Sequence, residues 1–121
     1  MKGGENLGVV NVHVVYGNQW KEYVNATIAT TPDKVFVITT EDGKNLTYPF
    51  DSVISVVVTD ASGTGPDTIK VNYNTGPASS RVFEGASLFW WDEWVIVEEG
   101  TGRDILAAYR MNYISSIEVN P

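Results

Sequence analysis

The sequence predicts an all-β fold: a small antiparallel barrel or two-layer sandwich built from two similar hairpin-plus-strand units, with little or no helix. Three observations support this prediction. Short runs rich in Val, Ile, Thr, Tyr and Phe recur about every ten residues between Gly, Asn, Asp and Pro, as strands between turns do. Apolar residues make up 43% of the chain and charged residues 19%, which is enough apolar material for a core. A long segment of the first half is also echoed in the second half.

The apolar runs predict a strand at each position where they recur. We expect strands at 8–16, 23–30, 34–40, 45–50, 53–59, 67–74, 81–90, 93–98, 104–110 and 113–119. The segment RDILAAYRMN, residues 103–112, contains the Leu, Ala, Arg and Met typical of a helix. Its counterpart in the first half has the pattern of a strand, so we predict a strand here too.

Residues 34–58 and 93–119 share an apolar strand, an acidic glycine turn, a basic-then-polar pair and a returning strand. The turns correspond as Gly43-Lys44-Asn45 and Gly102-Arg103-Asp104, and two extra residues fall within 105–108. The ends correspond at an offset of 61, in the pairs Tyr48/Tyr109, Phe50/Met111, Asp51/Asn112, Val53/Ile114, Ser55/Ser116, Val56/Ile117 and Val58/Val119. Duplication and convergence on a common barrel pattern both explain this repeat.

The repeat predicts units at 20–59 and 81–119 within a single β domain that spans residues 1–121. In each unit we expect an Asx residue, Asp51 or Asn112, to bend the chain through a side-chain hydrogen bond to the backbone two residues on. The glycine-rich segment TDASGTGPDT, residues 59–68, is expected to be a flexible connection.

The segment ATIATTPDKVFVITTEDGKNLTYPFDSVISVVV combines a strand, an acidic glycine turn and a PF..V..V return. Over about 35 residues it resembles pleckstrin-homology-like and GRAM-like barrels, and SH3-like and Sm-like barrels follow the same strand-turn-strand logic. The resemblance implies a small barrel that reads a peptide or a small ligand. Those pleckstrin-homology-like folds close with a C-terminal helix, whereas this chain ends on YISSIEVNP.

Composition argues against several classes of partner. The chain has a net charge of -7 and no basic run, so we expect no nucleic-acid binding. No stretch approaches the 18 or more apolar residues of a membrane span, so we expect no membrane insertion. It contains no cysteine, which excludes disulfides and thiolate chemistry. The N-terminal residues MKGGENLG lack the pattern of a signal peptide, so we expect a protein that is cytoplasmic or lies within a virion or other assembly made in the cytoplasm.

The sequence offers little chemistry for catalysis. His13 is the single histidine, and we expect it on a half-exposed polar face of a strand. The carboxylates cluster as Glu41-Asp42, Asp92-Glu93 and Glu98-Glu99, where neighbours on a strand point to opposite faces. We therefore predict a protein that is not an enzyme and that uses no cofactor and no metal.

The most unusual stretch is SLFWWDEWVIVEE, residues 87–99, which we expect to form a hairpin with Asp92-Glu93 at its tip. Both faces of this hairpin are apolar, so both must be covered. Either both belong to the protein's own core, or a partner protein covers the outer face, because Trp is enriched in interface hot spots. A planar ligand stacked on the indoles is a third alternative.

We predict a non-enzymatic protein-protein interaction or assembly module, a small structural or accessory subunit of a larger viral or filament-like complex. It is expected to bind a protein partner or to self-associate as an oligomer. The residues expected to bind the partner are Phe89, Trp90, Trp91 and Trp94, together with Trp20. The alternative is a monomeric pleckstrin-homology-like adaptor barrel that binds a peptide or a small ligand.

Overall fold

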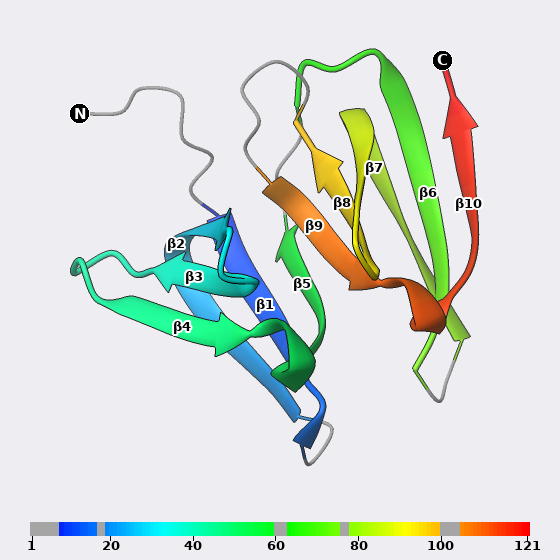
Figure 1. Ribbon diagram of the computed structural model, residues 1–121. Helices are drawn as coiled ribbons and strands as arrows, with labels where there is room; N and C mark the ends of the chain where they lie inside the picture. The colour runs from blue at the N-terminus through cyan, green and yellow to red at the C-terminus, as the bar shows by residue number, and fades with distance from the viewer. Residues whose placement is uncertain (1–7, 17–18, 60–62, 76–77, 100–104) are drawn as a thin grey trace. The chain divides into compact units, whose positions relative to one another are not determined.

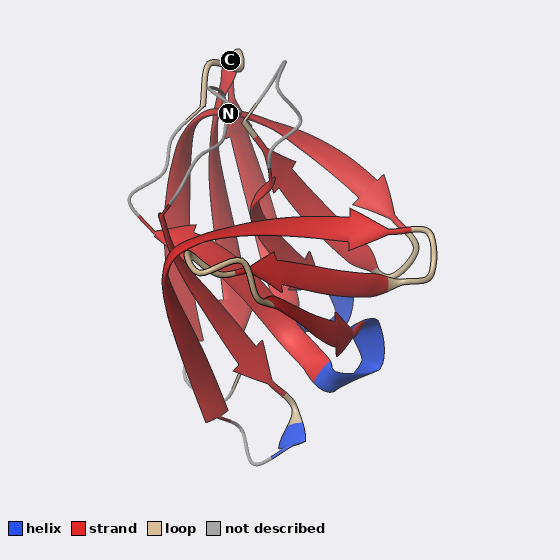
Figure 2. Ribbon diagram, turned by 90° about the vertical axis from the view of Figure 1, so that its left-hand side faces the viewer, coloured by secondary structure: helices blue, strands red, loops and turns tan. Residues whose placement is uncertain are grey.

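The computed structural model describes residues 8–16, 19–59, 63–75, 78–99 and 105–121. In these ranges the chain is all-β, which confirms the predicted fold class, and Figure 2 shows strands interrupted by short helical turns. A strand lies at each predicted position, and the one segment with helical composition forms a strand at Ile105–Arg110. The chain divides into two compact units, residues 1–61 and 62–121.

The described residues of unit 1 form five strands, in the antiparallel order β5-β1-β2-β3-β4 (Figure 1). A 3-10 turn, η2, precedes its last strand. The elements are β1 (Gly8–Val14), β2 (Gln19–Thr31), β3 (Val35–Thr39), β4 (Asn45–Pro49), η2 (Phe50–Ser52) and β5 (Val53–Thr59).

Unit 2 repeats this organisation, with the antiparallel order β10-β6-β7-β8-β9 and a 3-10 turn, η3, before its last strand. The elements are β6 (Asp67–Asn74), β7 (Ala78–Trp91), β8 (Trp94–Glu98), β9 (Ile105–Arg110), η3 (Met111–Tyr113) and β10 (Ile114–Asn120). The repeat therefore includes a first strand, β1 or β6, that lies outside the predicted units 20–59 and 81–119.

Corresponding elements have nearly equal lengths, including one long strand of 13 residues in unit 1 and 14 in unit 2. The offset between units is 61 for the 3-10 turns and last strands, as predicted, and 59 at the start of β3 and β8. Part of this difference is a register irregularity between Val97 and Glu98, where β9 accommodates an additional residue. The predicted second turn, Gly102-Arg103-Asp104, lies outside the described residues.

Each long strand bends at a bulge. Register shifts occur where β2 passes from Tyr23 to Ala26 along β1, and where β7 passes from Phe83 to Ala86 along β6. Asn25 (φ 54°) and Gly85 (φ 65°) lie in these bulges with left-handed backbone, which asparagine and glycine tolerate best. Because of the bend, the first half of each long strand pairs with the unit's first strand and the second half pairs with the third.

The chain turns at the predicted corners, but backbone hydrogen bonds close each turn. The Val53 N–H donates to the Phe50 carbonyl and the Ile114 N–H donates to the Met111 carbonyl, each closing a 3-10 turn. At the first corner the Ser52 hydroxyl donates to the Pro49 carbonyl at 2.8 Å. The predicted side-chain hydrogen bonds of Asp51 and Asn112 are therefore not what forms the corner.

Aromatic and β-branched side chains form the core of each unit. In unit 1 the rings of Phe36 and Phe50 lie 4.7 Å apart between centroids. In unit 2 the Tyr109 ring contacts Tyr73 at 5.0 Å and Phe83 at 6.4 Å. Strands β5 and β9 are apolar and buried along almost their whole length, as expected for strands covered on both faces.

The glycine-rich segment is held at its second half, which differs from the predicted flexible connection. Residues 60–62 lie outside the described residues, but the Gly63 N–H donates to the Glu84 carbonyl at 3.1 Å. The Thr64 N–H donates to Glu99 at 2.8 Å, and the Gly65 N–H donates to Gly85 at 2.8 Å. These bonds attach the segment to the β7 bulge and to the residue after β8.

Candidate functional site

The tryptophan-rich stretch forms the predicted hairpin. Strands β7 and β8 pair from Ser87 opposite Glu98 to Trp91 opposite Trp94, so Asp92 and Glu93 form a two-residue turn. Asp92 has φ 58°, a left-handed conformation that Asp adopts more readily than most residues. We call the end of this hairpin, residues 89–95, the aromatic tip.

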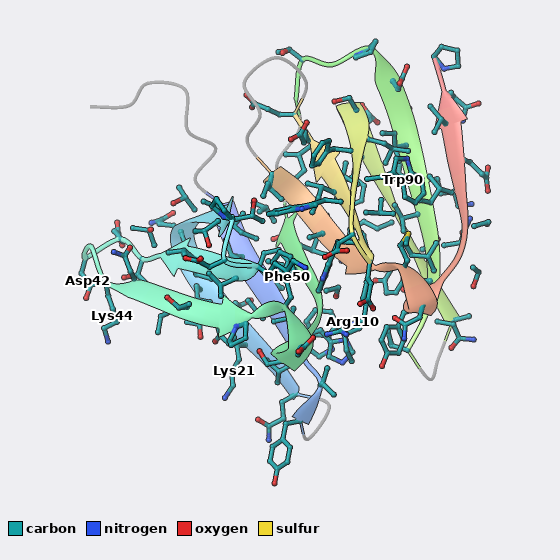
Figure 3. All side chains as sticks on the ribbon, viewed as in Figure 1. Lys21, Asp42, Lys44, Phe50, Trp90 and Arg110 are labelled. Carbon is teal, nitrogen blue, oxygen red and sulfur yellow. The ribbon has the colours of Figure 1, made fainter. Side chains whose placement is uncertain are left out.

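Contacts with Trp94, Arg110 and Met111 hold the aromatic tip in place. Trp94 is almost completely buried, and it pairs with Arg110, whose guanidinium lies 5.5 Å from the centre of its ring. The Met111 N–H donates to the Glu93 carbonyl at 2.7 Å, which ties the turn to η3. The side chains of Trp90 and Arg110 are labelled in Figure 3. A buried ring, a cation-π contact and a backbone hydrogen bond therefore hold the tip in place.

Two aromatic side chains remain exposed on the tip. Phe89 lies opposite Ile96 and is 47% exposed, whereas Trp90 lies opposite Val95 and is 58% exposed. Because neighbours on a strand point to opposite faces, the tip presents one aromatic ring on each side. Ile96 and Val95 are themselves buried. The apolar side chains of β8 are thus buried in the core, whereas Phe89 and Trp90 near the end of β7 are exposed to solvent.

The predicted binding residues fall into three groups. Phe89 and Trp90 are exposed, and Trp91 beside them is half-buried. Trp94 belongs to the core and supports the tip from within. Trp20 lies in unit 1, at the start of β2, and the structure does not group it with the other four.

Trp20 covers the single histidine. Its ring stacks on His13 with 4.2 Å between centroids and 15° between planes, and Trp20 is 51% exposed. The prediction of a half-exposed His13 is wrong, because His13 is only 2% exposed. Its strand is paired on both sides, with Trp20 opposite on β2 and Ser55 opposite on β5, and the indole closes the remaining access.

Tyrosine hydroxyls form the other notable polar sites. The Tyr23 and Tyr48 hydroxyls are hydrogen-bonded to each other, and partial burial together with this bond raises the pKa of Tyr48. In unit 2, burial raises the pKa of Tyr109 above its usual range, and the neighbouring Tyr73 adds to the shift. Raised pKa values keep the Tyr48 and Tyr109 hydroxyls protonated and therefore neutral.

The described part of the chain shows no group of three or more His, Asp or Glu side chains placed to hold a metal ion. No helix among the described residues is long and apolar enough to cross a membrane. The Asp92 and Glu93 carboxylates lie at the tip and Glu98 and Glu99 lie at the opposite end of β8, which places the two acidic pairs apart.

No protein family, curated protein or solved structure matches this chain.

Sequence reasoning located the aromatic hairpin but not which of its rings are exposed, nor the residues that support them. The repeat paired Met111 with Phe50, yet it did not show that the Met111 backbone binds the tip turn. It also gave no reason to place Arg110 over Trp94. The signal available in advance was position: Arg110 ends the strand that pairs with β8, and Met111 follows it directly.

Proposed function

We propose that the protein is a non-enzymatic protein-protein interaction module, a structural or accessory subunit of a larger assembly, which binds its partner through Phe89 and Trp90. The observation that carries this proposal is the aromatic tip: two large exposed rings on a turn held by Trp94, Arg110 and Met111. Exposed aromatic residues on a rigid support bury a large area at low entropic cost.

The arrangement of the tip favours insertion into a groove on a protein. Phe89 and Trp90 point to opposite sides of one strand, so a flat ligand stacked on one ring would leave the other in water. A groove in a partner encloses both sides of the tip. Asp92 and Glu93 at the turn add negative charge, which favours a groove with a basic end.

A photo-crosslinking experiment tests the proposal in the cells that produce the protein. A benzoylphenylalanine in place of Phe89 is compared with the same residue in place of Val82, which lies on the same strand and is 53% exposed. We expect a discrete crosslinked product from position 89 that position 82 does not give. Identical products from both positions, or none from position 89, would refute a specific contact at the tip.

The partner identified by mass spectrometry then allows a quantitative test. Trp90→Ala is expected to weaken binding by about 30-fold or more, since truncating an interface hot spot costs about 2 kcal/mol or more. Val82→Ala serves as the matched control and should leave the Kd unchanged. Equal affinities of wild type and Trp90→Ala, with both proteins folded, would remove the tip from the interface.

A further inference from the structure

Each unit has two outer strands, one at each end of its strand order. By position in the repeat, β5 corresponds to β10, and β4 corresponds to β9. Within its own unit each of these strands has a single neighbour: β5 pairs with β1, β10 with β6, β4 with β3 and β9 with β8. Each unit by itself therefore has one edge of each kind.

Corresponding outer strands differ in burial. Val56 and Val58 on β5 are buried, whereas Val119, which corresponds to Val58, is 45% exposed on β10. Tyr109 on β9 is buried, whereas Tyr48 at the corresponding position of β4 is only half-buried. Among the described residues, β4 and β10 are thus the more exposed outer strand of each kind.

An open edge strand presents backbone N–H and C=O groups that another strand can pair with. Natural proteins usually protect such an edge with lysine, proline or a bulge. Strand β10 has no lysine or proline within Ile114–Asn120, and its register irregularity is confined to its first residues, between Ile114 and Ser116. Strand β4 carries Pro49 only at its last position. Both edges are therefore weakly protected.

We infer that β4 of one copy pairs with β10 of a second copy, so that the chain assembles head to tail. One chain supplies one exposed outer strand of each kind, and this pairing uses both. The charge pattern favours it: β10 carries Glu118, whereas Asn45–Pro49 of β4 contains no charged residue. Two β10 strands pairing with each other would bring two Glu118 carboxylates close together and leave β4 unused.

Such a contact also covers apolar side chains. Val119 and the half-buried Ile117 lie on β10, and the half-buried Leu46 and Tyr48 lie on β4. Because the contact joins different surfaces of identical chains, it repeats from copy to copy and forms a closed ring or a filament. Each copy carries a net charge of -7, so added salt should tighten the assembly by screening repulsion.

The first test compares two valine-to-lysine variants by light scattering after size-exclusion, over a hundredfold concentration range at low and high salt. Val119→Lys places a charge on the exposed outer strand β10, whereas Val82→Lys places the same charge on β7, at a residue that pairs with Lys70 of β6. We expect multiples of 13.3 kDa for wild type and Val82→Lys, and at least a tenfold shift towards monomer for Val119→Lys. A monomeric wild type throughout, or equal behaviour of the two variants, would overturn the inference.

The second test uses the absence of cysteine from the chain. Thr47→Cys on β4 and Ser116→Cys on β10 are prepared separately, mixed and oxidised, because a disulfide forms only when the two Cα atoms come within about 7 Å. We expect disulfide dimers chiefly in the mixture, each joining one Thr47→Cys chain to one Ser116→Cys chain. Dimers of Ser116→Cys alone, in the same yield, would show a symmetric contact and refute head-to-tail pairing.

This inference rests on the proposed role in assembly but uses different residues, so the two can fail separately. Trp90→Ala should leave the self-assembly by β4 and β10 intact while it weakens partner binding. If Trp90→Ala dissociates the oligomer and Val119→Lys does not, the contact between copies lies at the aromatic tip, and the edge pairing is wrong.

Discussion

Replacement of Gly85 by alanine tests how the β7 bulge is built. Gly85 has φ 65°, which costs a residue with a Cβ about 1 kcal/mol. Its Cβ would also overlap the Gly63 carbonyl, so the segment at 63–65 would have to move away. That movement breaks the hydrogen bonds from Gly63 to Glu84 and from Gly65 to Gly85, each with a net value of about 1 kcal/mol. The expected loss of stability for Gly85→Ala is therefore about 3 kcal/mol.

Gly43 provides a matched control. It lies in the turn between β3 and β4, where Figure 3 labels Asp42 and Lys44, and it has φ 88°. Apart from Gly43 itself and its two chain neighbours, no described residue has an atom within 4 Å of the position that its Cβ would occupy. Gly43→Ala should therefore lose only the stability that a left-handed backbone costs an alanine, about 1 kcal/mol.

Urea unfolding followed by tryptophan fluorescence measures both variants. With a slope of about 1–3 kcal/mol per molar urea, Gly85→Ala should lower the midpoint by roughly 1 to 3 M, and Gly43→Ala by about a third of that. The difference of about 2 kcal/mol reports the attachment of segment 63–65. If the two variants lose the same stability within about 0.5 kcal/mol, the close contact between Gly63 and Gly85 contributes nothing and the reasoning is refuted.

Three further predictions follow from the packing. Trp94→Ala should lower the free energy of unfolding in urea by about 3–5 kcal/mol, because Trp94 is buried. Trp90→Ala should lower it by about 1 kcal/mol or less. Equal losses would contradict the assignment of Trp94 to the core and Trp90 to the surface. Because burial raises the pKa of folded Tyr109, its contribution to the free energy of unfolding should be complete below pH 10. Above pH 10 the free energy of unfolding should fall by about 1.4 kcal/mol per pH unit. Tyr109→Phe should remove this part of the alkaline loss in urea titrations at pH 8–11, and an unchanged slope would refute it. Tyr48→Phe and Tyr23→Phe should each lower the free energy of unfolding by about 1 kcal/mol. The double variant should lose less than the sum, since both substitutions remove the same hydrogen bond. Additive losses would contradict the shared bond.

Local pattern was sufficient for much of the fold. Runs of β-branched and aromatic residues located the strands, because a strand's propensity and its turn residues are adjacent in the chain. The offset of 61 located both corners, and Asp92-Glu93 located the hairpin turn. These features depend on residues a few positions apart, which sequence reasoning can compare directly.

Burial was harder to predict, because it depends on which strands lie on either side. His13 has the alternation of a half-exposed strand, yet β1 is paired on both sides and Trp20 stacks on the ring. Trp90 and Trp94 are the same residue type in one hairpin, and their different exposure depends on β9, which pairs with β8 and brings Arg110 over Trp94.

The sequence by itself determined the all-β class, the order of strands along the chain, the repeat and the position of the aromatic hairpin. Only the tertiary structure decided which aromatic rings remain exposed, that the repeat includes β1 and β6, and that Gly63 packs on Gly85. The physical reason is distance along the chain. Propensity and turn chemistry act between neighbouring residues, whereas exposure and close backbone contacts depend on separate strands and segments, such as those of Gly63 and Gly85.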